Sequence, residues 1–353
     1  MAYGTLSVLD HLNASQQTVA EFGEDQAFDA IQRSLDAHNA ITAEVLMDLV
    51  EFTSDNLRRY GTVSTMEMEE VDEFGAVDVQ KMTAGANVGF PLRKSQIAIQ
   101  WTRTFMLTQR AGELAAQAVA AQEADRRGIQ KSIKRAVFTP TNSLTYVDRL
   151  VDNVTLPLRA FLNADGTGVP NGPNGESFDG ATHTHYLATA ALVAANVSAL
   201  IETVLEHGVS GQVVVYINRS QEAAIRAMAN FSPYMDARII PSTTTSRSSG
   251  TLLMTNINSR AIGTFDAAEV WVKPWIPASY LFCFDKRTVA KPLVFRTRTG
   301  APTGLGALGI AADHEHYPLR AQHMEREFGI GVYTRTAGAV LYTGGGAYVT
   351  PTF

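Results

Sequence analysis

The sequence has 353 residues, of which 45% are hydrophobic and 18% charged, and a formal net charge of −6. This apolar content suffices for one elaborate domain or two interleaved ones, and the low charged content favours further burial between subunits. The acidic balance argues against a dedicated nucleic-acid binder. No apolar run is long enough to span a membrane, and the N-terminal segment lacks a signal-peptide pattern. The single cysteine, Cys283, excludes an intrachain disulfide and makes a reducing cytoplasm the natural folding site.

Charge is distributed unevenly along the chain. Residues 21–78 contain fifteen acidic residues against three arginines, a local balance of −12, whereas residues 81–135 contain ten basic residues against three acidic ones, a balance of +7. Two solvated faces would account for this pattern. The alternative is electrostatic matching between subunits, which fixes register and the choice of partner more than affinity.

The N-terminal part begins with a segment that lacks strong periodicity, which we interpret as an arm. A helix is predicted from near Asp25, because Phe28, Ile31 and Leu35 are spaced to share one face. The acidic residues at its start favour the positive end of a helix dipole. We expect this helix to continue in some form to Tyr60.

Residues 62–104 have the polar pattern of an extended β-hairpin. Strand-like alternation occurs at residues 66–69, 77–80 and 97–101, and glycine and proline interrupt the pattern between the arms. A hairpin with so few large apolar residues cannot fold on a core of its own. We therefore expect it to complete its burial against a neighbouring chain.

A long alanine-rich helix is predicted from Phe105 to Phe138, a stretch without proline. At 1.5 Å per residue it would be about 50 Å long, which is about the diameter of a compact chain of this size. Small residues cover most of its surface and would let other chains pack closely. Together with the hairpin, this helix predicts a flat, extended subunit.

The second half of the chain predicts an α/β lobe followed by further strands. A loop rich in asparagine, glycine and proline covers residues 163–175. Helices are then predicted at residues 188–207 and, capped by Ser220, at 220–230, with strands at 212–217 and 238–241. Further strand-like runs occupy residues 251–256, 261–265, 270–273, 279–284, 293–296, 328–333, 337–342 and 347–350. The fold class that follows is α+β.

Histidines provide the one pattern that suggests a metal. His183 and His185, like His314 and His316, are spaced i,i+2, which places both rings on one face of a strand, and His323 lies nearby. Such pairs are weak signals without a third fixed ligand and a partner for the other ring nitrogen. We therefore interpret them as polar residues that close turns.

Residues 304–309 match the pattern G-x-G-x-x-G, but the flanking sequence predicts neither the preceding strand nor the following helix that a dinucleotide site needs. No set of nucleophile, base and carboxylate stands out. We predict no catalytic, cofactor-binding or metal site, and no enzymatic activity.

The order of these parts resembles the major capsid proteins of tailed bacteriophages, whose Hong Kong 97-type fold is shared with encapsulins. An arm and acidic helix, a polar hairpin, a long helix, an α/β lobe and late strands occur in that sequence. Shorter similarities to phage capsid proteins lie at residues 325–332, 336–342 and 346–348, and at residues 178–186, 206–208 and 218–221. The resemblance covers nearly the whole chain, and the order of elements contributes most of it.

The resemblance implies five segments. They are an N-terminal arm with the acidic helix (1–61), an extended β-hairpin loop (62–104), the first part of a peripheral domain with a long spine helix (105–187), an α/β axial domain (188–290) and return strands of both domains (291–353).

The function that the resemblance implies is structural. Pentamers and hexamers of the chain would form the icosahedral head of a virion around double-stranded DNA, after assembly in the bacterial cytoplasm. Implied partners are further copies of the chain, separate scaffolding, portal and cement proteins, and packaged DNA through non-specific contacts, but no membrane. Two alternatives stay open. One is an encapsulin shell around a cargo enzyme, which chain length disfavours; the other is a metal-dependent enzyme that uses His183, His185, His314 and His316.

Contacts between subunits would then involve charged residues of the hairpin and of the basic part of the long helix. Large interfaces of the obligate class, about 2,000 Å² or more, would account for the low charged content. We expect ion pairs between subunits at Glu67, Glu69, Glu70, Lys81, Arg93, Lys94, Arg126 and Arg127.

Overall fold

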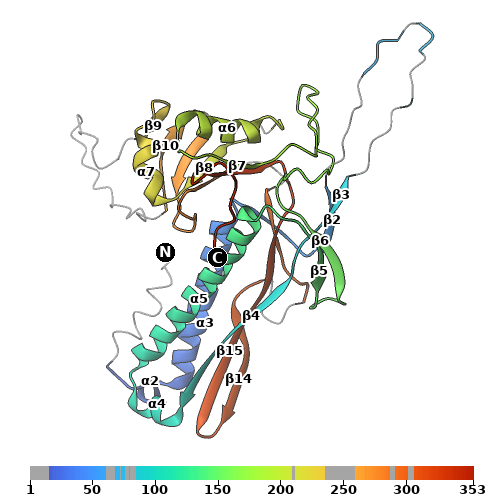
Figure 1. The fold of residues 1–353 in the computed structure, drawn as a ribbon. Coiled ribbons are helices and arrows are strands. Elements are labelled where there is room, and N and C mark those ends of the chain that lie inside the picture. The colour runs from blue at the N-terminus through green and yellow to red at the C-terminus, as the bar shows by residue number, and fades with distance from the viewer. Residues whose placement is uncertain are drawn as a thin grey trace.

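The computed structural model describes residues 16–60, 68–71, 73–75, 79, 85–208, 211–234, 259–266, 268–286, 291–300 and 306–353. Two long helices lie beside a sheet of long strands, and a second sheet with short helices lies at one end of that pair (Figure 1). The α+β prediction is confirmed. In the described part of the chain, no helix is both long and apolar enough to cross a membrane.

The predicted acidic helix is α3 (Glu24–Leu46), and a single turn, α2 (Val19–Phe22), precedes it. Thr18 starts α2 with a capping box. Its hydroxyl accepts a hydrogen bond from the Glu21 amide (3.3 Å), and the Glu21 carboxylate accepts one from the Thr18 amide (3.0 Å). The buried face of α3 includes Ile31, as the spacing predicted.

The predicted continuation of this helix to Tyr60 is wrong, because α3 ends at Leu46. The following residues form two short strands, β1 (Val50–Thr53) and β2 (Leu57–Tyr60). β1 pairs in parallel with β13 (Leu293–Arg296). The β-branched and aromatic side chains of β1 suit that pairing, so contacts with a distant strand override local helix periodicity.

The predicted long helix is interrupted near its start. It consists of α4 (Arg103–Thr108) and α5 (Ala111–Phe138), with extended backbone at Gln109 and Arg110. The N-terminal segment pairs with this break. The Val19 amide donates to the Gln109 carbonyl (3.1 Å), and the Ala111 amide donates to the Gln17 carbonyl (3.2 Å). With 28 residues, α5 is still about 42 Å long.

The first sheet is built around one long strand, β15 (Leu319–Val332), in the order β1-β13-β15-β14, with β4 also paired to β15. β4 (Arg93–Thr102) pairs with residues 319–328 of β15, and β13 pairs with residues 329–332. β14 (Gly309–His316) and the first part of β15 were not predicted, because their many polar residues suggested surface loops.

The helices α3 and α5 lie side by side and against this sheet (Figure 1). A buried hydrogen bond joins Gln122 of α5 to Ser34 of α3 (2.7 Å). One turn further along α5, Asp125 lies 2.8 Å from the Arg326 guanidinium of β15 and 2.9 Å from the His38 ring of α3. We call these last three residues the Asp125 cluster.

The second sheet contains seven strands in the order β7-β16-β12-β8-β11-β10-β9. Their bounds are β7 (Tyr186–Ala188), β16 (Gly338–Tyr342), β12 (Tyr280–Asp285), β8 (Val213–Ile217), β11 (Ala268–Val272), β10 (Arg260–Phe265) and β9 (Phe231–Pro233). Alternate residues of β12 contribute to two cores. Leu281 and Cys283 pack in the cluster of α6 (Ala194–Leu205), while Phe282 and Phe284 pack with the C-terminal end of α5.

Most of the strands predicted for this region are confirmed, whereas both predicted helices are shorter in the structure. Helix α6 is shorter than the predicted helix at 188–207, whose first residue belongs to β7. The next helix is a short pair, η1 (Arg219–Gln221) and α7 (Glu222–Arg226), and Asn218 caps it rather than Ser220. Residues 347–350 form no strand, and the predicted strands at 238–241 and 251–256 lie outside the described residues.

Two small antiparallel pairs complete the fold, β2 with β3 (Ala86–Gly89) and β5 (Ser143–Asp148) with β6 (Val154–Leu158). We call the chain between β2 and β3, residues 61–85, the β2–β3 excursion. Its described residues 68–71 and 73–75 lie far from both sheets (Figure 1). The predicted strand at 97–101 is part of β4, whereas those at 66–69 and 77–80 lie mostly outside the described residues.

Candidate functional site

The predicted contact residues fall on three parts of the molecule. Glu69 and Glu70 lie exposed on the β2–β3 excursion, and Arg93 and Lys94 begin β4. Arg126 and Arg127 lie on α5. Two further predicted residues, Glu67 and Lys81, lie outside the described residues.

Lys94 has a partner within its own chain. Its ammonium nitrogen lies 2.6 Å from the carboxylate of Glu325 on β15, and Gln96 donates to the same carboxylate (2.9 Å). The side chain of Glu325 is only 4% exposed. The hydrogen bonds from Lys94 and Gln96 lower the Glu325 pKa. Lys94 therefore helps to bury a carboxylate between β4 and β15, a role that the sequence did not reveal.

Arg93 lies beside a surface hollow of about 210 Å³ between β4, the end of α5 and the β5–β6 pair. Its guanidinium lies over the Tyr146 ring, 6.0 Å from the ring centroid. Arg135 and Arg159 also line this hollow. The hollow is therefore basic and would suit an acidic segment.

The guanidinium groups of Arg126 and Arg127 are largely solvated, with side chains 63% and 68% exposed. Each lies near Glu123, one turn earlier, at 3.9 Å and 3.7 Å. Pairs of this exposure and length contribute only a few tenths of a kcal/mol. Both residues could therefore exchange Glu123 for an acidic group of another chain at little cost.

Apolar side chains are unusually exposed on the β2–β3 excursion. Met68 and Val79 are 103% and 96% exposed, values close to those of an unfolded chain. A second exposed apolar group, Val45 (67%) and Met47 (62%), lies at the end of α3. When exposed apolar groups of this kind cluster, they mark a surface that binds other molecules.

A histidine cluster is present, but its members differ from those expected. His183 and His185 flank Thr184 just before β7, and they converge with Glu206 and His207 at the end of α6. Burial lowers the pKa of His183 and His185 and, to about 4, that of His207, so the three rings are neutral at pH 7. These four residues could hold a metal ion.

The other predicted histidines do not join this cluster. His314 and His316 lie on β14, where the His314 ring packs against that of His323, with centroids 5.6 Å apart. The set of His183, His185, His314 and His316, which the alternative of a metal-dependent enzyme would use, therefore does not come together. The third histidine is His207, which follows a helix end and has no second histidine near it in the sequence.

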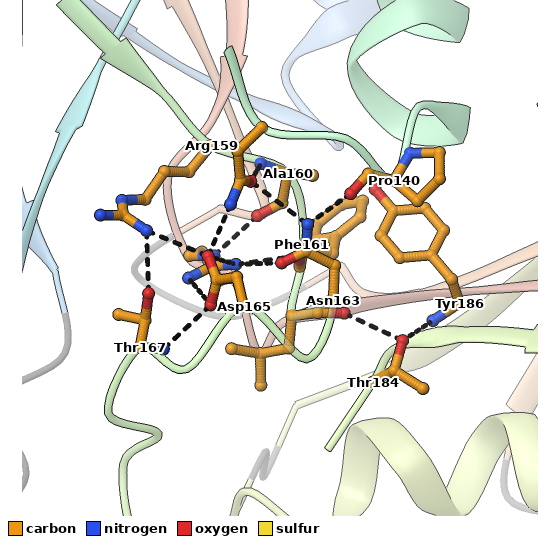
Figure 2. Close-up of polar contacts among 12 residues, drawn as sticks. Pro140, Arg159, Ala160, Phe161, Asn163, Asp165, Thr167, Thr184 and Tyr186 are labelled. Carbon is orange, nitrogen blue, oxygen red and sulfur yellow. Dashed lines mark hydrogen bonds and ion pairs between the residues drawn. The ribbon is translucent and has the colours of Figure 1, made fainter. Parts of the chain in front are cut away.

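A buried arginine, Arg335, ties the loop after β6 to the segment before β16. Arg335 is fully buried, and its Nε donates to the Ala160 carbonyl (2.7 Å). One terminal nitrogen donates to Asn163 (2.9 Å) and Asp165 (3.0 Å). Arg159 also donates to Asp165 (3.0 Å), as Figure 2 shows. We call these residues the Arg335 anchor.

The Arg335 anchor depends on an ionised Asp165. Burial opposes ionisation, but the Arg335 charge and hydrogen bonds from Thr167 outweigh it and lower the pKa of Asp165 to about 2. The same loop meets the start of β7, because the Thr184 hydroxyl donates to the Leu162 carbonyl (3.4 Å) and accepts from the Tyr186 amide (3.1 Å) (Figure 2). The anchor thus supports the segment that holds His183 and His185.

This arrangement of sheets and helices is the Hong Kong 97-type capsid fold, so the predicted fold is confirmed. A solved structure from Mycobacterium phage Patience matches with a TM-score of 0.67 and 21% sequence identity, over 92% of this chain and 89% of that one. The capsid of an empty GTA particle matches at 0.47, with 14% identity over 84% and 88% of the two chains. The SrpI encapsulin of Synechococcus elongatus matches at 0.45, with 12% identity over 89% and 92%. No family model and no curated protein matches this sequence.

Replacing Asp165 with asparagine should destabilise the chain in a pH-dependent way. The folded pKa of about 2 lies below the unfolded value of about 3.9, so ionised Asp165 stabilises the fold above about pH 4. This stabilisation is lost as the pH falls toward 2. We expect Asp165→Asn to lower the free energy of unfolding by about 2 kcal/mol at pH 7, and by about half as much at pH 3.

Urea unfolding at both pH values, with all variants in the same oligomeric state, measures this difference. Asp152→Asn is the matched control, because Asp152 is an exposed aspartate between β5 and β6. If the two variants had equal unfolding midpoints at pH 7, Asp165 would not be a stabilising part of the anchor.

Proposed function

We propose that this chain is the major capsid protein of a tailed bacteriophage. Its copies, arranged as pentamers and hexamers, would form an icosahedral shell that encloses double-stranded DNA. The role is structural rather than catalytic, and its place is the virion, after assembly in the cytoplasm of a bacterial host.

The observation that supports this proposal most strongly is the extent of the structural match. The shared fold covers 92% of this chain and 89% of the phage chain, so the match extends far beyond either sheet alone. A match confined to the seven-stranded sheet would support only a common α/β lobe. Here the whole subunit has the form of a shell component.

The segments then receive the roles that the resemblance implied. Residues 62–104 would be the extended loop that covers a neighbouring subunit, and α5 would be the spine of the peripheral domain in residues 105–187. Residues 188–290, with α6 and most of the seven-stranded sheet, would be the axial domain. The return strands in residues 291–353 would join both parts, since β15 lies in the first sheet and β16 in the second.

Burial of the β2–β3 excursion would provide apolar contact energy. Met68 and Val79 expose nearly all of their surface in the single chain. Burying one such side chain completely is worth roughly 1.5–3 kcal/mol. Repeated around a closed shell, this contribution would favour assembly without strong binding at any single contact.

Charge would set the register of these contacts. The excursion is acidic at Glu69 and Glu70, whereas α5 presents exposed Arg126 and Arg127. We infer that the acidic excursion of one copy lies against a basic surface of the next, which includes the hollow beside Arg93. Glu67 and Lys81 stay in this proposal as predicted contacts.

Scaffolding, portal and cement proteins stay possible partners, as does non-specific contact with packaged DNA. An encapsulin-type shell around a cargo enzyme is the alternative with the same fold, and the contents of the shell separate the two. The other alternative was a metal-dependent enzyme that uses four histidines together. It has no support, because His314 and His316 lie apart from the cluster at His183 and His185.

Expression of the chain in bacteria tests the proposal directly. We expect closed shells, or rings of five or six subunits, in size-exclusion chromatography and electron microscopy. Co-expression with a scaffolding protein extends the test if the chain alone stays monomeric. Persistent monomers under both conditions would contradict the proposal, and shells filled with a specific enzyme would favour the encapsulin alternative.

Polar substitution in the excursion should prevent assembly while leaving the subunit folded. Met68 and Val79 contact little within their own chain, so Met68→Ser/Val79→Ser should not change its unfolding midpoint. We expect at least a tenfold lower yield of shells, measured by sedimentation. Met68→Leu/Val79→Ile is the matched control, because it retains the apolar surface. Normal assembly of the serine variant would show that these side chains are not buried between copies.

Reversing the charges on α5 tests the proposed ion pairs. Arg126→Glu/Arg127→Glu should reduce the assembly rate several-fold, and more strongly at low salt, because the acidic excursion would meet like charges. Lys94 is unsuitable for this test, since its reversal would place two carboxylates together beside Glu325. Arg126→Gln/Arg127→Gln is the control for loss of charge alone. Assembly rates equal to that of the unmodified chain would overturn the pairing.

A further inference from the structure

Three imidazole nitrogens meet at one point beside the seven-stranded sheet. The Nε2 atoms of His183, His185 and His207 lie 3.2, 3.1 and 3.1 Å from one another. A carboxylate oxygen of Glu206 lies 3.5 Å from Nε2 of His183 and 3.9 Å from that of His207. In a tetrahedral zinc site with Zn–N distances of about 2.0–2.1 Å, ligand atoms are about 3.3–3.4 Å apart.

We propose that His183, His185, His207 and Glu206 bind a zinc ion that fastens the end of α6 to the start of β7. Nothing in this proposal depends on assembly of the chain into shells. It replaces the expectation from the sequence that the chain has no metal site.

The hydrogen bonds of His185 orient its ring as a metal ligand. Its Nδ1 lies 2.8 Å from the Gly338 carbonyl, which can only accept a hydrogen bond. In a neutral ring the proton is therefore on Nδ1, and the lone pair of Nε2 points toward the other two histidines. Metal-binding histidines usually have such a backbone or carboxylate partner on the second ring nitrogen.

Hydrogen bonds among the rings alone do not account for this cluster. A protonated Nε2 can only donate and an unprotonated Nε2 can only accept, so at most two of the three edges of the triangle can be hydrogen bonds and at least one edge brings two like groups together. The Nδ1 atom of His207 is also buried without a well-formed hydrogen bond. Leaving a buried polar group unpaired is unfavourable. A cation at the centre would accept all three lone pairs.

The surroundings suit a closed, structural site. His185 is fully buried, and the side chain of His207 is 2% exposed and that of His183 16%. The Phe178 ring packs against both His183 and His207, with centroids 4.8 and 4.5 Å apart. Four protein ligands leave no position for a substrate, which distinguishes this arrangement from a catalytic zinc centre.

The position in the fold also favours a cation. Glu206 and His207 directly follow α6, where the helix dipole is negative. His185 is fixed by backbone hydrogen bonds on both sides, from its amide to Leu162 (2.8 Å) and from the Val340 amide to its carbonyl (2.8 Å). The ligands therefore come from two segments, the one before β7 and the end of α6, and a metal would cross-link them in a chain whose single cysteine allows no disulfide.

Zinc uptake by the purified full-length chain tests this proposal. The chain is stripped with a chelator, and binding of added Zn²⁺ is followed by calorimetry and by elemental analysis. We expect one zinc per chain and a Tm several degrees above that of the stripped chain. Added Co²⁺ should give the intense visible absorption of a tetrahedral site. Absence of zinc uptake, or a weak octahedral cobalt spectrum, would overturn the proposal.

Variants identify the ligands. His207→Gln and His183→Gln should each weaken zinc binding by more than about 100-fold. His183 is the more exposed of the two, so its variant provides the test if His207→Gln does not fold. His316→Gln is the matched control, because that exposed histidine lies on β14. Unchanged zinc affinity in both cluster variants would exclude this site, whatever the oligomeric state of the chain.

Discussion

The elongated half of the subunit depends on the Asp125 cluster, a group of polar side chains buried where α3, α5 and β15 meet. The side chains of Asp125 and Arg326 are only 5% and 4% exposed. Removing such charges from water costs several kcal/mol for each ion, and only good geometry recovers that cost. If α5 slipped by one residue against β15, a buried charge would lose its partner. The cluster therefore specifies one register between helices and strand, rather than adding much net stability.

The same buried charges explain where sequence reasoning failed. Glu325, Arg326 and Glu327 are consecutive and all nearly fully buried, although such a run ordinarily indicates exposed surface. The partners of Glu325 and Arg326, which are Lys94 and Asp125, are about two hundred residues away in the chain, so no local pattern could show these pairings. By contrast, β12 was predicted correctly, because a strand buried on both faces is a continuous apolar run that needs no knowledge of its partners.

The candidate sites were predictable to different degrees for a related reason. The i,i+2 spacing identified His183 and His185, but the third ligand, His207, comes from a helix end that only the folded sheet brings near. The uneven charge along the chain indicated one acidic and one basic stretch. It could not distinguish partners within the chain from partners in another copy, and Lys94 proved to have one within its own chain. The sign and the clustering of charged residues can be read from the sequence, whereas the ion-pair partner of each residue depends on the fold.

These features distinguish the body of the subunit, whose elements are joined by buried polar contacts, from the β2–β3 excursion. The Asp125 cluster, the Arg335 anchor and the proposed zinc ion each fix one junction between elements. The β2–β3 excursion, in contrast, exposes Met68 and acidic side chains away from the body. A subunit that is ordered before association loses less conformational entropy on binding, so modest contacts would suffice for the proposed shell. If the body were disordered in the single chain, the same contacts would have to order the body as well as bind the neighbouring subunit. The buried charges add little stability to a single chain. Because they fix the positions of its elements, they are nevertheless consistent with the proposed assembly of many copies.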